Sequence, residues 1–215
     1  MKNLAIIIPS YKCKECLEEL VIRIFAAIKN IELNCNIVFI DDGSPDNSWQ
    51  KIKVLKEKYS NIIGIKLSRN FGQHTAITAG LDLVEAEYYI VMDCDLQHDP
   101  KYIPILFKKI LNEKKQIIFT YGKRKHSKVK LIFSKLFYYF VNVFMRDGDN
   151  IVSHELQNYV IFSQKVKKKL DEFRFRNRHL LFLLRSLGFE KDYLEVDHKE
   201  RFAGKSSYNF MSLTL

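Results

Sequence analysis

The chain has 215 residues, which is long enough for one domain with a sizeable core. Hydrophobic residues make up 47% of it, against only 8 Gly and 4 Pro, and this balance excludes a disordered protein. The formal net charge of +10 favours anionic partners such as nucleotides, phospholipid headgroups or nucleic acid, although solubility alone explains the charge equally well.

Both ends of the chain carry weak signals. The first apolar run stops at Pro9 and is too short for a secretory signal, so none is expected. Residues 206–215 lack a helix stop signal, which is typical of a truncated chain or of a peripheral tail. Residues 129–145 are the most apolar helix candidate, but two lysines and an asparagine interrupt them. We therefore expect an amphipathic or interfacial helix there and no membrane span.

The chain contains four cysteines, Cys13, Cys16, Cys35 and Cys94. The first two form a lone C-x-x-C motif, with no further ligand pair at zinc spacing and no thioredoxin-like context. We therefore predict structural or incidental thiols, a pattern that fits a reducing cytosol.

The first 120 residues alternate short apolar runs with helical periodicity. In chain order the pattern predicts strands at 4–8, 36–40, 62–67, 88–92 and 116–121, separated by helices at 17–28, 48–59, 75–84 and 103–111. After residue 125 it predicts a helix at 128–145, a strand at 157–162, a helix at 176–187 and a strand at 189–197. This order predicts an α/β fold whose mostly parallel sheet has helices on both faces.

The most informative feature is the pair Asp93 and Asp95, which directly follows a predicted buried strand. Side chains two apart on a strand point the same way, so both carboxylates are expected to converge. Hard oxygen ligands of this kind suit Mg²⁺ or Mn²⁺, which help a diphosphate to leave. The alternative is an acidic loop that caps the helix after Pro100, a role that Asp99 alone could fill.

Tyr11, Asp41 and Asp42 also come directly after predicted strands. Ligands of parallel sheets bind at the carboxyl ends of the strands, so one crevice is expected to gather these residues with the aspartate pair. The sequence therefore indicates a protein that binds a nucleotide diphosphate.

Five motifs in family order resemble the family 2 glycosyltransferases of the GT-A fold. They are Ile8-Pro9-Ser10-Tyr11, Asp41-Asp42-Gly43-Ser44-Pro45-Asp46, Asn70-Phe71-Gly72, residues 93–100, and residues 201–208. The likeness is greatest to polyprenyl-phosphate glycosyltransferases of the dolichol-phosphate mannosyltransferase type. It implies one GT-A domain over residues 1–215, with a nucleotide-sugar half at about 1–122 and an acceptor-side half at about 123–215.

The resemblance implies roles for residues of the first half. Asp42 would accept hydrogen bonds from the nucleotide base or ribose, with Pro9 and Tyr11 as the wall beside the base. A plain turn or helix cap is the alternative role of Asp42. Asp93, Asp95 and Gln97 would bind the metal and the diphosphate, and Asp95 would be catalytic.

The resemblance also places basic residues over the phosphates. Arg124 and Arg201 would act in catalysis, because a planar guanidinium suits bidentate phosphate contact. Lys205 would bind the donor diphosphate from the same R-x-x-G-x-S loop as Arg201, and Lys135 would lie on the acceptor side. A solvated loop is the alternative reading for the lysines beside Arg124.

One position departs from the family pattern. Asn158 stands where many relatives carry an acceptor-side aspartate, and an asparagine cannot act as a general base. A hydroxyl acceptor normally needs such a base, which Glu155 or His154 would have to replace. A phosphate-monoester acceptor is already ionised, since its second pKa is about 6. The departure therefore favours a lipid-phosphate acceptor and also leaves room for weakened activity.

We therefore expect an inverting, metal-dependent glycosyltransferase that moves a sugar from a UDP- or GDP-linked donor to a polyprenyl phosphate. We expect a cytoplasmic protein at the inner face of the membrane, where basic and aromatic residues of 123–139 would contact anionic lipids. Packing of these aromatic residues within the domain explains them equally well. A glycan hydroxyl acceptor and a non-catalytic GT-A binding domain are the rivals. No nucleic-acid recognition motif is present, and a homo-oligomer is left open.

Overall fold

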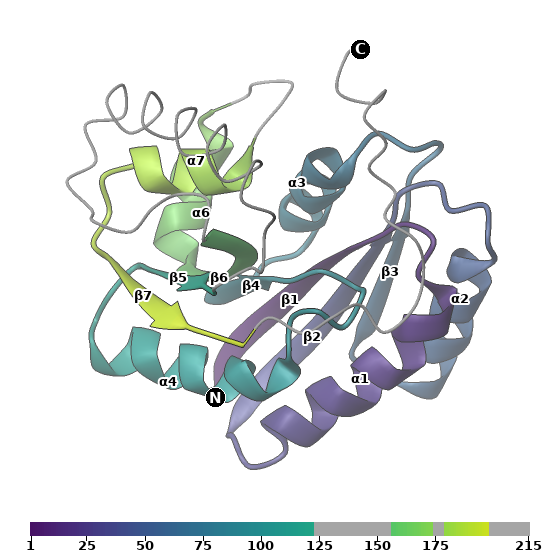
Figure 1. Ribbon diagram of the computed structural model, residues 1–215, viewed down its shortest axis with the longest axis horizontal. Helices are drawn as coiled ribbons and strands as arrows, with labels where there is room; N and C mark the ends of the chain where they lie inside the picture. The colour runs from purple at the N-terminus through teal and green to yellow at the C-terminus, as the bar shows by residue number, and fades with distance from the viewer. Residues whose placement is uncertain (123–155, 174–178, 198–215) are drawn as a thin grey trace, which may run out of the picture.

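The computed structural model describes residues 1–122, 156–173 and 179–197 (Figure 1). The strands of this part are β1 (Lys2–Ser10), β2 (Leu33–Asp41), β3 (Ile62–Lys66), β4 (Tyr88–Val91), β5 (Ile117–Tyr121), β6 (Leu156–Ser163) and β7 (Lys191–Glu195). Its helices are α1 (Lys14–Ile28), α2 (Ser48–Lys58), α3 (Gln73–Leu83), the 3₁₀ turn η1 (Pro100–Tyr102), α4 (Ile103–Asn112), α6 (Gln164–Asp171) and α7 (Leu180–Ser186).

The described strands form one sheet in the order β3-β2-β1-β4-β6-β5-β7. The first four strands in this order are parallel, and β7 is parallel to β5. Only β6 runs against its neighbours, β4 and β5. The predicted α/β fold with a mostly parallel sheet is confirmed.

Each face of the sheet carries its own hydrophobic core, and Figure 1 shows the helices that cover the two faces. Along β1, Leu4, Ile6 and Ile8 pack with α1, α2 and α4, whereas Ala5 and Ile7 pack with α3, α6 and α7. Burial on both sides explains why β1 reads as a continuous apolar run. It also makes β1 the centre of the fold, with β2 and β4 as its neighbours.

Helix α3 lies unusually close to the sheet. A Cβ atom at Gly80 would come within 2.7 Å of the Ile40 side chain and 3.0 Å of that of Ile7. Glycine therefore allows α3 to press against β1 and β2, and this contact fixes the position of the start of the helix.

The predicted elements are all present where the structure describes them, with shifted ends. Helix α3 begins two residues before the predicted Thr75, and α7 begins at Leu180 within the predicted helix 176–187, of which residues 176–178 lie outside the described ranges. The predicted helix 128–145 and the tail 206–215 lie outside the described residues. Within the described ranges, no helix is both long and apolar enough to cross a bilayer.

The cysteine prediction is wrong at two positions. Cys13 and Cys94 form a disulfide across 81 residues of sequence, with Cα atoms 6.5 Å apart, while Cys16 and Cys35 are free and buried. The fold brings the loop after β1 next to the loop after β4, a proximity that sequence spacing does not reveal. The argument from free thiols to a reducing compartment therefore loses its support.

Candidate functional site

The carboxyl ends of β1, β2 and β4 lie side by side at one edge of the sheet. Ser10 at the end of β1 pairs with Asp41 at the end of β2, and Ile7 of β1 pairs with Val91 at the end of β4. Pro9 is buried within β1, whereas Tyr11 just beyond the strand is partly exposed. The three loops that follow these strands therefore begin close together, as the sequence predicted.

The carboxylate of Asp42 is held by the segment that starts α3. The backbone N–H of Phe71 donates to Asp42 Oδ1 at 2.7 Å, and that of Gly72 donates to Oδ2 at 2.9 Å. Gly72 has a φ of +93°, a conformation that suits glycine, and it directly precedes the first residue of the helix. Asp42 thus fixes the α3 start, and each of its oxygens keeps a second lone pair.

Asp93 is held from two directions. Gln73, the first residue of α3, donates its side-chain Nε2–H to Asp93 Oδ1 at 2.5 Å. The backbone N–H of Asp93 donates to Nδ1 of His98 at 3.0 Å. The Asp93 side chain remains 28% exposed, so its carboxylate is accessible to solvent or to a ligand.

His98 supports this loop from the core. It is buried, and its ring stacks on that of Tyr159 with centroids 5.1 Å apart. The Tyr159 hydroxyl in turn donates to the backbone carbonyl of Asp99 at 3.3 Å. Tyr159 of β6 therefore supports the end of this loop at His98 and Asp99, and His98 links that end to Asp93.

Asp95 lies in a tight turn. Its Oδ1 accepts the backbone N–H of Gln97 at 3.1 Å, and Leu96 between them has a φ of +63°. Burial, with the negative charge of Asp95 as the next cause, raises the pKa of the Cys16 thiol on α1. Asp95 therefore lies near α1, while Asp93 contacts α3.

The geometric reason given for the aspartate pair needs correction. Strand β4 ends at Val91, so Asp93 and Asp95 lie in the following loop, where strand alternation no longer sets their direction. Their orientation is set instead by Gln73 and His98 on one side and by the Asp95–Gln97 turn on the other.

The donor chemistry of this loop fits a hard divalent cation. Among the described residues, no three or more His, Cys, Asp and Glu side chains are arranged as a complete metal cage. Two carboxylates and the Gln97 amide nevertheless suit Mg²⁺ or Mn²⁺, because such ions are commonly held by one or two carboxylates together with substrate phosphates and water.

Asn158 of β6 lies at the same end of the sheet as Asp93. Val91 of β4 pairs with Val160 of the antiparallel strand β6. Asp93 lies two residues after Val91, and Asn158 lies two residues before Val160. Both therefore lie just beyond the end of the pairing between β4 and β6. The other acceptor-side residue, Lys135, lies outside the described ranges, as do Arg124, Arg201 and Lys205.

The sequence analysis missed Gln73 entirely. The only signal was its position immediately after the Asn70-Phe71-Gly72 motif. Asp41, beside the site, is fully buried, and burial raises the pKa of its carboxyl group although Ser44 partly opposes the shift. His74, next to Gln73, packs against His179 with ring centroids 4.3 Å apart.

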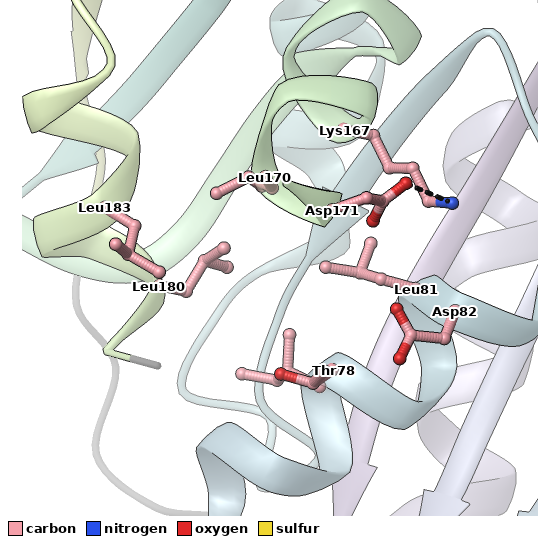
Figure 2. Close-up of a pocket in the computed structure, with 9 residues that line it drawn as sticks. Thr78, Leu81, Asp82, Lys167, Leu170, Asp171, Leu180 and Leu183 are labelled. Atoms are coloured by element: carbon pink, nitrogen blue, oxygen red, sulfur yellow. Dashed lines mark ion pairs between the residues drawn. The ribbon is translucent and has the colours of Figure 1, made fainter. Parts of the chain in front are cut away.

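A separate pocket lies between α3, α6 and α7 (Figure 2). Figure 2 shows Thr78, Leu81 and Leu180 around it, with the ion pair of Lys167 and Asp171 at 2.9 Å on one side. None of the predicted site residues lines it. This pocket is therefore distinct from the polar edge formed by the β1, β2 and β4 loops.

Comparison with known proteins gives a family and several curated relatives. The family model described as glycosyl transferase family 2 matches residues 5–186. The undecaprenyl-phosphate 4-deoxy-4-formamido-L-arabinose transferase of Shewanella sediminis is 32% identical over 97% of this chain and 62% of its own length. The enzyme of the same name from Photorhabdus laumondii is 29% identical over 99% of this chain and 65% of its own length. The chain thus spans just under two thirds of these relatives.

Solved structures share the fold at low sequence identity. One is glucosyl-3-phosphoglycerate synthase from Mycobacterium tuberculosis in complex with Mn²⁺, UDP and glucosyl-3-phosphoglycerate. Its TM-score is 0.66 at 14% sequence identity, and the match covers 93% of this chain and 73% of the synthase chain. The mannosyltransferase PcManGT from Pyrobaculum calidifontis, in complex with GDP-Man and Mn²⁺, has a TM-score of 0.63 at 14% identity, over 90% of this chain and 55% of its own. These likenesses confirm the GT-A fold predicted from the sequence.

Proposed function

The chain belongs to glycosyl transferase family 2, and we propose that it transfers a sugar from a nucleotide-diphosphate sugar to a polyprenyl phosphate. The names of the two curated relatives support the acceptor class, since both are undecaprenyl-phosphate transferases. The observation that carries the proposal is the pair of carboxylates, Asp42 and Asp93, that residues 71–73 hold at the carboxyl edge of the sheet.

The donor nucleotide would bind across this edge. Asp42 would accept a hydrogen bond from the base or ribose with the lone pairs that Phe71 and Gly72 leave unused. Tyr11, partly exposed after β1, would contact the base together with Pro9. Because Asp42 is almost fully buried, its carboxylate would be poorly solvated, and a hydrogen bond from the ligand would be correspondingly strong.

Mg²⁺ or Mn²⁺ would be held by Asp93, Asp95 and Gln97. When bound, such an ion supplies charge neutralisation for the departing diphosphate. The contributions of the chain itself are positional: Gln73 orients the Asp93 carboxylate, His98 holds its backbone, and the Asp95–Gln97 turn fixes the second carboxylate. Arg124, Arg201 and Lys205 would add positive charge over the phosphates.

The acceptor would approach from the side of Asn158 and Lys135. Asn158 cannot remove a proton, and a phosphate monoester does not require this, because its second pKa is about 6. In-line attack of the phosphate oxygen on the anomeric carbon would invert the configuration of that carbon. A lipid acceptor requires the protein to work at a membrane surface, and we place it at the cytoplasmic face.

The test is a transfer assay with UDP- and GDP-linked sugars, in which undecaprenyl phosphate and a soluble glycan are compared as acceptors. We expect a lipid-linked sugar product that requires Mn²⁺ or Mg²⁺ and is lost in Asp95→Ala. Transfer to the glycan alone would replace the acceptor class by a hydroxyl acceptor. Turnover retained by Asp95→Ala would rule out the metal role of this residue.

A further inference from the structure

The start of α3 contacts two loops that belong to different strands. Residues 71 and 72 donate backbone N–H groups to Asp42 after β2, and residue 73 donates a side-chain amide to Asp93 after β4. Strand β1 lies between β2 and β4, so this short segment crosses the carboxyl end of β1. The start of α3 thus connects the proposed nucleotide position to the proposed metal position.

The segment is well suited to hold these carboxylates in place. Helix α3 packs on β1 and β2 through Gly80, where added side-chain atoms would collide with Ile40 and Ile7. A Cβ atom at Gly43 would lie 2.5 Å from the backbone of Arg69, so the turn after Asp42 packs against the residues that lead into α3. The donors on residues 71–73 therefore belong to a segment that is closely packed on both sides, at the turn of Gly43 and at Gly80 of α3.

We propose that Gln73 is a positioning residue that orients the Asp93 carboxylate for the catalytic divalent cation. This inference rests on the proposed function. The Gln73 amide donates one hydrogen bond to Oδ1 of Asp93, and because a carboxylate oxygen can accept more than one interaction, this contact is compatible with a cation on the same carboxylate. A neutral donor fixes the carboxylate without cancelling its charge, whereas a lysine at the same place would compete with the cation.

Hydrogen bonds to the ligands of a metal typically contribute 10–100-fold to its affinity or to activity. In this chain the contact fixes the direction of a carboxylate that stays 28% exposed with the amide in place. Loss of the amide should therefore weaken cation binding, with little effect on the fold.

The chain supplies a matched control. Gln164 is the first residue of α6, as Gln73 is of α3, and its Nε2–H donates to the carboxylate of Glu85 at 3.3 Å. Both glutamines are partly buried. Gln73→Met and Gln164→Met each remove one amide–carboxylate hydrogen bond from the first turn of a helix, and Met resembles Gln in size and helix propensity.

The experiment measures Mn²⁺ affinity by electron paramagnetic resonance, with Mn²⁺ alone and with saturating UDP or GDP. We expect Gln73→Met to weaken Mn²⁺ binding about 10–100-fold and Gln164→Met to leave it unchanged. Both variants should keep their unfolding midpoints within about 2 °C of the native protein. In the transfer assay, excess Mn²⁺ should restore the turnover of Gln73→Met, an effect that a purely structural role would not produce.

The outcomes separate this inference from the proposed function. A change of less than twofold in Gln73→Met, with Mn²⁺ binding intact in the native protein, would overturn the positioning role alone. Mn²⁺ binding that is absent from the native protein, even with UDP or GDP, would overturn the proposed metal site and this inference together.

Discussion

Helices α3 and α6 each begin with a glutamine whose amide donates to a carboxylate, but the surroundings of the two carboxylates differ. At α6, the Gln164 amide donates to the Glu85 carboxylate, which also forms an ion pair with the Lys167 ammonium at 3.3 Å. At α3, Gln73 donates to Asp93, and the neighbouring Phe71 and Gly72 donate neutral N–H groups to Asp42.

This difference separates a structural contact from a candidate site. Lys167 is buried, and burial alone would lower the pKa of its ammonium group. The carboxylates of Asp171 and Glu85 outweigh this effect and raise the pKa. In this cluster the positive charge of Lys167 therefore pairs with the negative charges of Asp171 and Glu85. The hydrogen bonds that α3 contributes come from neutral donors, so they orient the carboxylates of Asp42 and Asp93 without cancelling their negative charge. A divalent cation and a nucleotide are ligands that use such charge.

The largest effect is expected from removal of the carboxylate that Gln73 contacts, with removal of the carboxylate that Gln164 contacts as the control. Asp93→Ala should abolish nucleotide-dependent Mn²⁺ binding and lower transfer at least about a thousandfold, because a bound metal contributes several kcal/mol to such a reaction. Glu85→Ala should change neither quantity. Equal losses in the two variants, measured by Mn²⁺ titration and transfer rate, would remove the distinction between the two regions.

The disulfide ties the site edge together and has no counterpart at the start of α6. Reduction of Cys13–Cys94, or Cys94→Ser, should lower the free energy of unfolding by about 2–4 kcal/mol. Chemical denaturation with and without dithiothreitol measures this change. Cys16→Ser is the control, because it removes a buried thiol from the same motif and should leave the sensitivity to dithiothreitol intact.

Removal of the Asp42 carboxylate tests the α3 start from its other side. Asp42→Ala should cost about 2 kcal/mol of stability, because two backbone N–H groups lose their acceptor, and should also weaken nucleotide binding. Asp46 also accepts backbone N–H groups, from Lys14 and Ser48, in the same loop. Asp46→Ala should therefore lower stability but preserve nucleotide affinity, and denaturation together with calorimetry distinguishes the two variants.

The smallest effect concerns pH near the start of α3. Burial, followed by the charge of His179, lowers the pKa of His74 from 6.5 to about 4. The unfolded chain therefore takes up a proton at a higher pH than the folded chain, and stability should fall as the pH drops from 6.5 towards 4. His74→Gln should flatten this part of the curve of unfolding free energy against pH. Parallel curves for the two proteins would contradict the assignment.

The sequence predicted the elements of the described fold and the edge at which the site lies, because apolar periodicity and the position of residues after strands are local signals. Asp42 and Asp93 were predicted as site residues for this reason. Gln73 was missed because it lies 20 residues from Asp93, and their contact depends on where α3 begins. The Cys13–Cys94 bond was missed for a similar reason, since only the packed sheet brings two loops 81 residues apart into contact.

The most direct test of the central claim is a calorimetric titration of the protein with UDP and with GDP, each in the presence of Mn²⁺ and in the presence of EDTA. We predict that one nucleotide binds with Mn²⁺ and loses most of its affinity in EDTA, which would also identify the donor class. Binding of neither nucleotide, or equal binding with Mn²⁺ and EDTA, would contradict a metal-dependent donor site at the carboxyl edge of the sheet.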